Sequence, residues 1–188
     1  MDRRIERVIF DEEKHQYFYE GKELHGITHA ISEYMGKSFP DTDTVMIATM
    51  LGTTVHKEVE NYYNSNKEVS TESAKWVIKE LSDFADTCGD EVKAVKCEVM
   101  VSDFTGTASK VDIVMHTSNG VYLFDIKTIS KFDRLYCSLQ LSAYERLYKM
   151  CYDENVLGLF VLGTKSKRRF RILPQDKNII DKILAKNT

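Results

Sequence analysis

The feature that most constrains the fold is a pair of apolar segments within residues 106–128, which read GTASKVDIVMHTSNGVYLFDIKT. Both segments are rich in β-branched and aromatic residues, which favour strands. The break between them, Ser118-Asn119-Gly120, has the residue types of a tight hairpin turn. Residues such as Ile113 and Phe124 make the strands apolar on both faces, as expected where helices cover a sheet on either side. The sequence therefore predicts a buried central hairpin.

Three charged residues, Asp112, Asp125 and Lys127, interrupt this apolar hairpin. Side chains alternate between the two faces of a strand, so Asp125 and Lys127 share a face, with Cα atoms roughly 7 Å apart. A two-residue turn at Asn119-Gly120 would place Asp112 opposite Lys127, and a turn at Ser118-Asn119 would place it opposite Asp125. Either register gathers the three charges on one face.

Charges at the edge of a buried sheet need compensation. Leaving them unpaired would cost on the order of several kcal/mol. A divalent metal ion would compensate the two carboxylates, and so would a structural salt bridge between an aspartate and the lysine. The hairpin by itself leaves both interpretations open.

Length and composition indicate a single domain that spans residues 1–188. The chain has 43% hydrophobic and 29% charged residues, two prolines, and no internal repeat, linker or low-complexity tract. A chain of this length can bury one proper hydrophobic core. The net charge of −3 provides no overall basic field for nucleic acid, although an acidic protein can still carry a local basic surface.

Two further patterns concern the cellular location. No apolar run approaches the roughly 20 residues that span a bilayer, and the charged start MDRRIERVIF lacks the apolar core of a signal peptide. The four cysteines are scattered, without the paired spacing typical of zinc or iron–sulfur sites. We therefore expect a cytosolic protein with reduced thiols and no membrane partner; the location is the host cytoplasm if a phage encodes the chain.

The rest of the chain contains further strand and helix patterns. The segment RVIFDEEKHQYFY and the turn residues after it predict an N-terminal β-hairpin, and Thr28 is expected to cap a short helix over 29–35. Further strands are predicted over 92–101, 156–162 and 168–173, and helices over 44–63, 71–87, 134–152 and 176–186.

Several side chains outside the hairpin are candidates for a site. His56 and Glu60 lie four residues apart, hence on one face of their helix, and they follow Gly52, which would allow close approach to another backbone. Such a pair is often simply solvated. Glu98 interrupts the strand before the hairpin, where it could join a metal site or face the solvent.

The most basic stretch of the chain is a predicted turn, GTKSKRR, between the last two strands. A hairpin tip of this composition indicates contact with phosphate groups, although a solvated loop has the same composition. Its basic residues are Lys165, Lys167, Arg168 and Arg169.

Four segments form a combined motif along the chain. They are GTTVHKEVE with His56, VDIV with Asp112, DIKT with Asp125 and Lys127, and QLSAY with Gln140 and Tyr144. In this order they resemble the RecB-like, phage exonuclease-type branch of the PD-(D/E)XK nuclease superfamily. The DxK spacing alone is common by chance, but its combination with the other three segments is specific.

The resemblance covers most of the chain and departs from the family pattern at one point. The opening hairpin followed by Gly26-Ile27-Thr28 is also similar to the start of such phage proteins. The family often has an acid three residues after a glycine, and here Ser109 occupies that place after Gly106. Asp112 nevertheless precedes Ile113 and Val114 as the pattern requires.

The resemblance implies an α/β fold, more narrowly α+β, with a restriction-endonuclease-like core. In such a core a central mixed β-sheet is flanked by helices, and here the N-terminal β-hairpin is added to it. It also implies hydrolysis of phosphodiester bonds with Mg²⁺ or Mn²⁺. Oxygen-rich ligands suit these hard cations, which activate water and offset the charge that develops on the phosphate.

The resemblance further implies a role for each motif residue. Lys127 would orient or deprotonate the attacking water and neutralise charge on the phosphate, while Gln140 and Tyr144 would line the site and hold the DNA strand or the water. The implied catalytic residues are Asp112, Asp125, Lys127, Gln140 and Tyr144. The implied metal ligands are His56, Asp112, Asp125 and the Ile126 backbone carbonyl, with Glu60 and Glu98 as further candidates. The candidates for DNA binding are Lys165, Lys167, Arg168 and Arg169.

The expected function is that of a metal-dependent DNA nuclease in replication, repair or recombination, with exonuclease activity favoured over sequence-specific endonuclease activity. DNA is the expected partner, a single-strand annealing or other recombination protein is a further candidate, and oligomerisation is left open. The sequence contains no GxxxxGK[ST] phosphate loop and so no helicase motor. The alternative is a catalytically degenerate nuclease fold that serves in DNA binding or assembly. Its signature would be loss of the DxK or histidine positions, and both are present.

Overall fold

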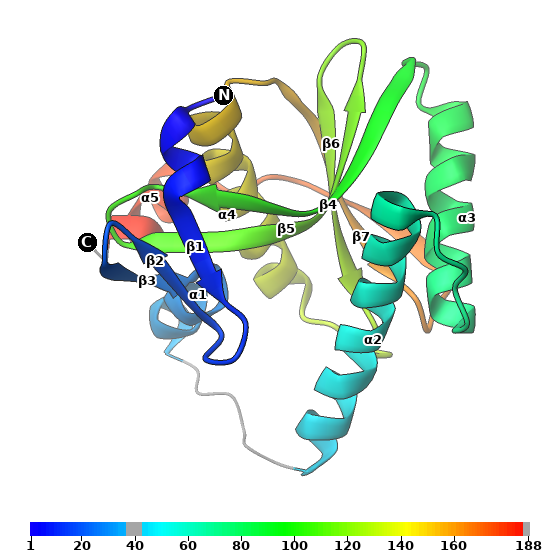
Figure 1. Cartoon of the computed structure of the whole chain (residues 1–188), viewed down its shortest axis with the longest axis horizontal. Coiled ribbons are helices and arrows are strands. Elements are labelled where there is room, and N and C mark those ends of the chain that lie inside the picture. The colour runs from blue at the N-terminus through cyan, green and yellow to red at the C-terminus, as the bar shows by residue number, and fades with distance from the viewer. Residues whose placement is uncertain (37–42, 186–188) are drawn as a thin grey trace.

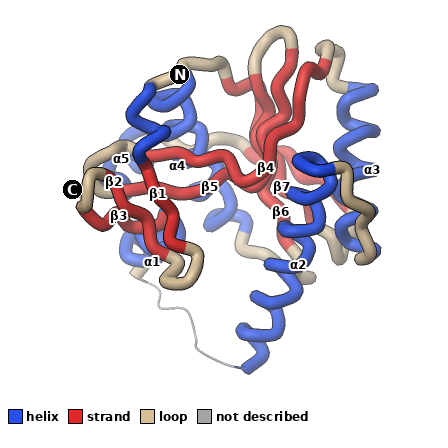
Figure 2. The backbone as a smooth tube through the Cα atoms, in the orientation of Figure 1, coloured by secondary structure: helices blue, strands red, loops and turns tan. Residues whose placement is uncertain are grey.

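The computed structural model describes residues 1–36 and 43–185, without the side chains of residues 43–51. In this part of the chain, helices flank both faces of a mixed sheet of eight strands, which makes the fold α+β (Figures 1 and 2). The first elements are η1 (Arg3–Arg7), β1 (Val8–Asp11), β2 (Gln16–Tyr19), β3 (Lys22–Gly26), α1 (Ile27–Met35), α2 (Asp43–Ser65) and α3 (Glu72–Thr87). They are followed by β4 (Val92–Ser102), β5 (Thr107–Thr117), β6 (Val121–Lys127), α4 (Arg134–Tyr152), β7 (Val156–Gly163), β8 (Arg168–Ile172) and α5 (Lys177–Ala185).

The central hairpin is formed by β5 and β6 in one of the two registers that the sequence allowed. The last paired rung before the charged residues joins Ile113 to Phe124. This register is the one expected for a turn at Ser118-Asn119. The pairing ends at that rung, so Asp112 and Asp125 lie just beyond it, where the two strands separate.

Strand β5 organises the sheet because it has neighbours on both edges. Along one edge it pairs with β4 from Ala108 to Thr117. The other edge is shared, since β3 runs parallel to Thr107 and Ala108 while β6 pairs antiparallel from Ile113 onwards. Residues 109–112 consequently face a gap between β3 and β6, where no strand of the described chain accompanies this edge.

Two apolar clusters lie on opposite faces of the sheet. Helices α1, α4 and α5 pack against one face, which includes Leu123, and α2 and α3 pack against the other, which includes Phe124. These adjacent residues show that β6 is apolar on both faces, as the sequence predicted. Asp125 and Lys127 continue the parity of Leu123, so they face α4.

The N-terminal hairpin extends further than the sequence indicated. A third strand, β3, follows it and joins the central sheet by pairing with β5. Helix α1 starts at Ile27 with Gly26 as its N-cap and without a capping side chain, so the prediction that Thr28 caps it is wrong. The completely buried side chain of Ile27 anchors the first turn instead. Lys186, the predicted end of the last helix, lies outside the described residues.

Two other expectations can be compared with the structure. All four cysteines are free, and burial raises the pKa of the Cys137 and Cys151 thiols to about 12 and about 11, so both stay protonated and unreactive at neutral pH. No helix in the described ranges combines the length and apolar character needed to cross a membrane.

Gly120 closes the turn between β5 and β6 in a conformation that tolerates no side chain. Its φ is 153°, and a Cβ atom there would lie 2.3 Å from the carbonyl oxygen of Asn155. We expect Gly120→Ala to lower the free energy of unfolding by about 3 kcal/mol, as measured by urea denaturation. Gly21→Ala is the control, because its φ is 82° and a Cβ would meet no atom within 4 Å; it should cost only about 1 to 2 kcal/mol of backbone strain. Equal losses would contradict a steric role for Gly120.

Candidate metal centre

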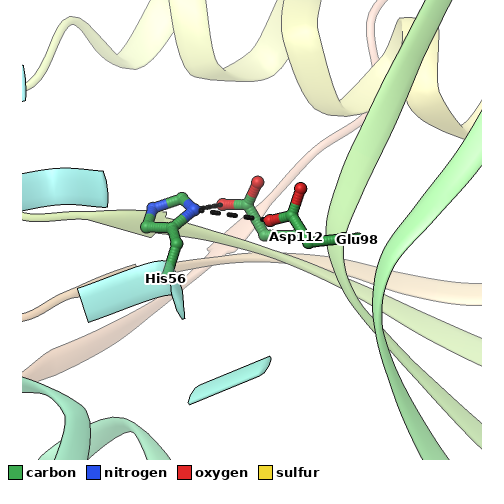
Figure 3. A group of neighbouring side chains, drawn as sticks. All are labelled: His56, Glu98 and Asp112. Atoms are coloured by element: carbon green, nitrogen blue, oxygen red, sulfur yellow. Dashed lines mark ion pairs between the residues drawn. The ribbon is translucent and has the colours of Figure 1, made fainter. Parts of the chain in front are cut away.

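Three side chains from three different elements meet at the gap beside β5. His56 of α2, Glu98 of β4 and Asp112 of β5, together called the metal centre below, each offer one ligand atom within 4.8 Å of the other two (Figure 3). The Nδ1 atom of His56 lies 3.8 Å from Oε1 of Glu98 and 3.7 Å from Oδ2 of Asp112. The three side chains are 28%, 27% and 12% exposed, respectively, so an ion can reach them from solvent.

The pairing of β4 with β5 brings the two carboxylates together. Glu98 and Asp112 lie between two paired rungs of this ladder, Cys97 with Ile113 and Val99 with Val111. Glu98 has a φ of 53°, which a residue with a side chain rarely adopts inside a strand. The backbone strain therefore falls at the residue that supplies a carboxylate, a coincidence typical of functional sites.

Asp112 also holds the fork between β5 and β6. Its Oδ2 accepts a hydrogen bond of 2.7 Å from the backbone N–H of Ile126, beyond the last paired rung of the two strands. The backbone carbonyl oxygen of Ile126 lies 3.3 Å from Nε2 of His56. The backbone of Ile126 thus touches two members of the metal centre, and its carbonyl group lies at the edge of the centre.

Helix α2 approaches the sheet closely enough for His56 to reach this fork. Gly52, one turn earlier, faces the segment that follows β6, and a Cβ atom there would lie 3.3 Å from the hydroxyl oxygen of Thr128. A larger residue would push the helix or the threonine away. The close approach expected from the sequence is therefore present, against a side chain rather than a backbone.

The remaining motif residues form a hydrogen-bonded chain next to the metal centre. The ammonium group of Lys127 lies 3.1 Å from Oδ1 and 2.8 Å from Oδ2 of Asp125. It also donates to Oε1 of Gln140 at 3.0 Å, and Nε2 of Gln140 donates to the hydroxyl of Tyr144 at 2.9 Å. The salt bridge and the histidine–carboxylate cluster therefore exist side by side.

Asp125 stands apart from the other predicted metal ligands in this structure. Asp125 is 1% exposed. Its Oδ2 atom forms an ion pair with Lys127, but it accepts no hydrogen bond from any described residue. Glu98, which the sequence left between a ligand and a solvent-exposed residue, supplies the second carboxylate of the cluster instead. Glu60 lies outside the cluster and accepts a hydrogen bond of 2.9 Å from Lys57.

Ser109, which stands where the resemblance often has an acid, lies close to two tyrosines. Its side chain lies close enough to the hydroxyls of Tyr144 of α4 and Tyr17 of β2 to lower the pKa of both, against the larger effect of burial, which raises them. Both tyrosines are buried and reach the part of β5 that faces the gap. Sequence reasoning missed Tyr17, since only the pairing of β3 with β5 brings the hairpin to this place.

The charges of the metal centre shift one another's pKa values. Burial lowers the pKa of His56, but the charges of Asp112, Glu98 and Asp125 outweigh burial and raise it to about 9. Burial is the main cause that raises the pKa of Asp112, to about 7; the charge of His56 opposes it, and the neighbouring carboxylates add to it. Both groups thus hold their protons at higher pH than usual, as expected where neighbouring carboxylates are not neutralised by a cation.

Lys127 remains an ammonium group in this environment. Burial lowers its pKa, but the charges of Asp125 and Asp112 outweigh burial and raise the pKa above its ordinary value. Burial likewise raises the pKa of the Tyr144 hydroxyl well above its ordinary value. Both groups are therefore hydrogen-bond donors at neutral pH.

The basic loop lies at the same end of the sheet as Lys127. The backbone N–H of Thr164 donates to the carbonyl oxygen of Lys127 at 3.0 Å. Two of the predicted DNA-binding residues already have intramolecular partners, since Lys167 donates to the carbonyl oxygen of Glu72 and Arg169 pairs with Glu80 at 2.9 Å. Lys165 and Arg168 are exposed at the tip.

The raised pKa of His56 predicts how the stability of the metal-free protein depends on pH. Its charge stabilises the fold fully below pH 6.5, its ordinary pKa, and this contribution is lost as the pH rises through about 9. Asp112 contributes in the same direction, because its raised pKa makes the fold lose stability as the pH rises from 3.8 to about 7.

Urea denaturation in the presence of EDTA tests this prediction at pH 6 and pH 9.5. We expect the wild type to lose about 1 to 3 kcal/mol more of its free energy of unfolding over this interval than His56→Gln does. Equal losses in the two proteins would contradict a charged His56 in the folded state.

Comparisons with known proteins add no relative from which a function could be transferred. The chain matches no protein-family model, and a search of curated proteins finds no match either. The function of the metal centre must therefore be inferred from its three side chains, His56, Glu98 and Asp112, and from their neighbours. These neighbours are the backbone carbonyl of Ile126 and the ammonium group of Lys127.

Proposed function

We propose that this chain is a metal-dependent DNA nuclease with a restriction-endonuclease-like core. One observation carries the proposal. A cluster of candidate ligands and a hydrogen-bonded lysine meet at the same gap in a mixed sheet, although the residues come from α2, β4, β5, β6 and α4. These are the segments whose combination resembles the RecB-like nucleases, with Glu98 in addition.

The donor set of the metal centre fits a hard divalent cation. The carboxylates of Glu98 and Asp112 and the carbonyl of Ile126 offer oxygen atoms, and His56 offers one nitrogen. The raised pKa values of His56 and Asp112 support the same conclusion, because a cation would supply the positive charge that bound protons otherwise provide. Glu98, Asp112 and Nδ1 of His56 would hold Mg²⁺ or Mn²⁺. The Ile126 carbonyl, which now faces Nε2 of His56, and Asp125 are the further ligands that the resemblance implies.

The ion, when bound, would lower the pKa of a water molecule and offset charge on the phosphate. The chain's own contribution is the ammonium group of Lys127. Because its pKa is raised, Lys127 would act as a fixed positive charge and hydrogen-bond donor toward a phosphate oxygen, rather than as a base. Gln140 and Tyr144 support this role, since their hydrogen bonds hold the ammonium group in place.

Lys127 and the topology of the substrate provide the direct test of activity. End-labelled linear DNA and covalently closed circular DNA are incubated with the protein in Mn²⁺ or in EDTA. We expect metal-dependent loss of the linear DNA alone, and a rate that falls by roughly 10² to 10³ in Lys127→Ala because a preorganised charge is removed. Lys79→Ala, an exposed residue of α3 paired with Asp83, is the control and should keep the wild-type rate.

The outcomes separate the activities under consideration. Cleavage of both the linear and the circular DNA would mean that the chain is an endonuclease rather than an exonuclease. Binding without cleavage in any metal would favour the degenerate, DNA-binding alternative. A Lys127→Ala variant as active as the wild type would remove this lysine from the mechanism.

Metal binding can be measured without activity. At a Mn²⁺ concentration 100 times the dissociation constant, the wild type should gain about 2.7 kcal/mol of stability, detected as a rise in melting temperature. Glu98→Gln and Asp112→Asn should lose most of this rise, because each removes a charged ligand. Asp83→Asn on α3 is the matched control and should keep it. Asp125→Asn distinguishes the ligand sets, since a full rise in this variant would exclude Asp125 as a ligand.

A further inference from the structure

A cation that belongs to none of the sequence motifs lies on the same strand as the metal centre. Lys110 precedes Asp112 by two residues in β5, so both side chains lie on one face of the strand, with Cα atoms roughly 7 Å apart. Its Nζ lies 4.1 Å from the centroid of the Phe10 ring, which belongs to β1. Within the described part of the chain, no carboxylate lies within ion-pairing distance of this ammonium group.

The N-terminal hairpin fixes the position of Lys110. Strand β1 crosses over β4 and β5 in Figure 1, which places Phe10 beside the lysine. The Phe10 ring packs on that of Tyr17, with centroids 4.7 Å apart. Burial raises the pKa of Tyr17 to about 12, the neighbouring Ser109 opposes this, and the charges of Glu98 and Asp112 add to it. An aromatic pair of the hairpin therefore lies against the part of β5 that carries Lys110.

The tip of this hairpin is near enough to helix α2 for a charge on one to affect a charge on the other. The pKa of Lys57, the residue after His56, is raised mainly by its hydrogen bond to Glu60 and by the negative charge of Glu60. The charge of Glu12 contributes as well. Glu12 lies in the turn between β1 and β2. The charge of the hairpin tip thus reaches α2, and Lys110 lies against Phe10 of the same hairpin.

We propose that Lys110, held over the Phe10 ring by the N-terminal hairpin, binds a phosphate of the DNA strand adjacent to the phosphate that is cleaved. This proposal rests on the proposed nuclease function and adds a substrate contact to it.

The physical reason is the negative charge of the site. Glu98, Asp112 and Asp125 would repel a DNA strand, and an ammonium group one step along the same strand face offsets that repulsion. The π face of Phe10 attracts the ammonium group and places it in advance, which lowers the entropy lost on binding. Lys110 also differs from Lys167 and Arg169, which already bond to other parts of the chain.

The test measures DNA binding separately from cleavage. Binding of a short fluorescent DNA strand is followed by anisotropy in Ca²⁺ over a range of KCl concentrations. Lys110→Met should weaken binding about 3- to 10-fold for any sequence, and the slope of log K against log salt should become shallower by about 1. In Mn²⁺, KM should rise by a similar factor while kcat stays nearly unchanged. Lys110→Arg should restore both the affinity and the slope.

Two controls separate phosphate binding from packing. Lys182→Met, at an exposed position of α5, has the same net charge as Lys110→Met and should behave as the wild type. Phe10→Leu keeps an apolar contact and removes the π face, so it should weaken binding without changing the salt slope. If Lys110→Met does not fold, Lys110→Gln serves the same measurements.

The outcomes distinguish this proposal from the function on which it rests. Wild-type affinity and salt slope in Lys110→Met, with cleavage by the wild type intact, would overturn the proposal and leave the nuclease function standing. A lowered melting temperature with unchanged binding would overturn it too, because Lys110 would then be structural only. If the wild type neither binds nor cleaves DNA, both proposals fall.

Discussion

The hydrogen bond from the Ile126 backbone to the Asp112 carboxylate is the interaction on which the site depends. At the fork between β5 and β6 a backbone N–H would otherwise lose its partner, and an unsatisfied buried donor costs about 1 to 3 kcal/mol. The aspartate satisfies the donor with one oxygen and faces His56 with the same atom. The side chain that completes the sheet is thus also one of the two carboxylates that the imidazole of His56 faces.

Sheet topology explains why the ligands can come from such distant parts of the chain. Strand β5 has β4 along one edge and divides the other edge between β3 and β6. The free segment of its edge is accessible to α2 from one face and to α4 from the other. A polar site can therefore exist inside a sheet that two apolar clusters otherwise seal, with Lys127 and Gln140 on the α4 side.

Part of this arrangement could be predicted from the sequence, because period-two alternation places Asp125 and Lys127 on one face of β6 and helical spacing indicated α4. Alternation also grouped Asp112 with them, whereas its carboxylate lies beside His56 of α2. The role of Glu98 could not be predicted, since alternation alone does not show which residue of β4 faces Asp112 or that its backbone turns there. The same limit applies to Tyr17 and Lys110, whose positions depend on a parallel pairing between residues some 80 positions apart. The ion pair between Arg169 and Glu80 depends on tertiary packing, and no local sequence pattern indicates it.

The left-handed backbone of Glu98 has a consequence for how such a chain could change over time. A glycine would relieve that strain, and removing one of the crowded carboxylates would relieve its repulsion with Asp112, at the cost of the charge that Glu98 places beside His56. Substitutions that raise stability should therefore accumulate at this position first whenever selection for the site is relaxed.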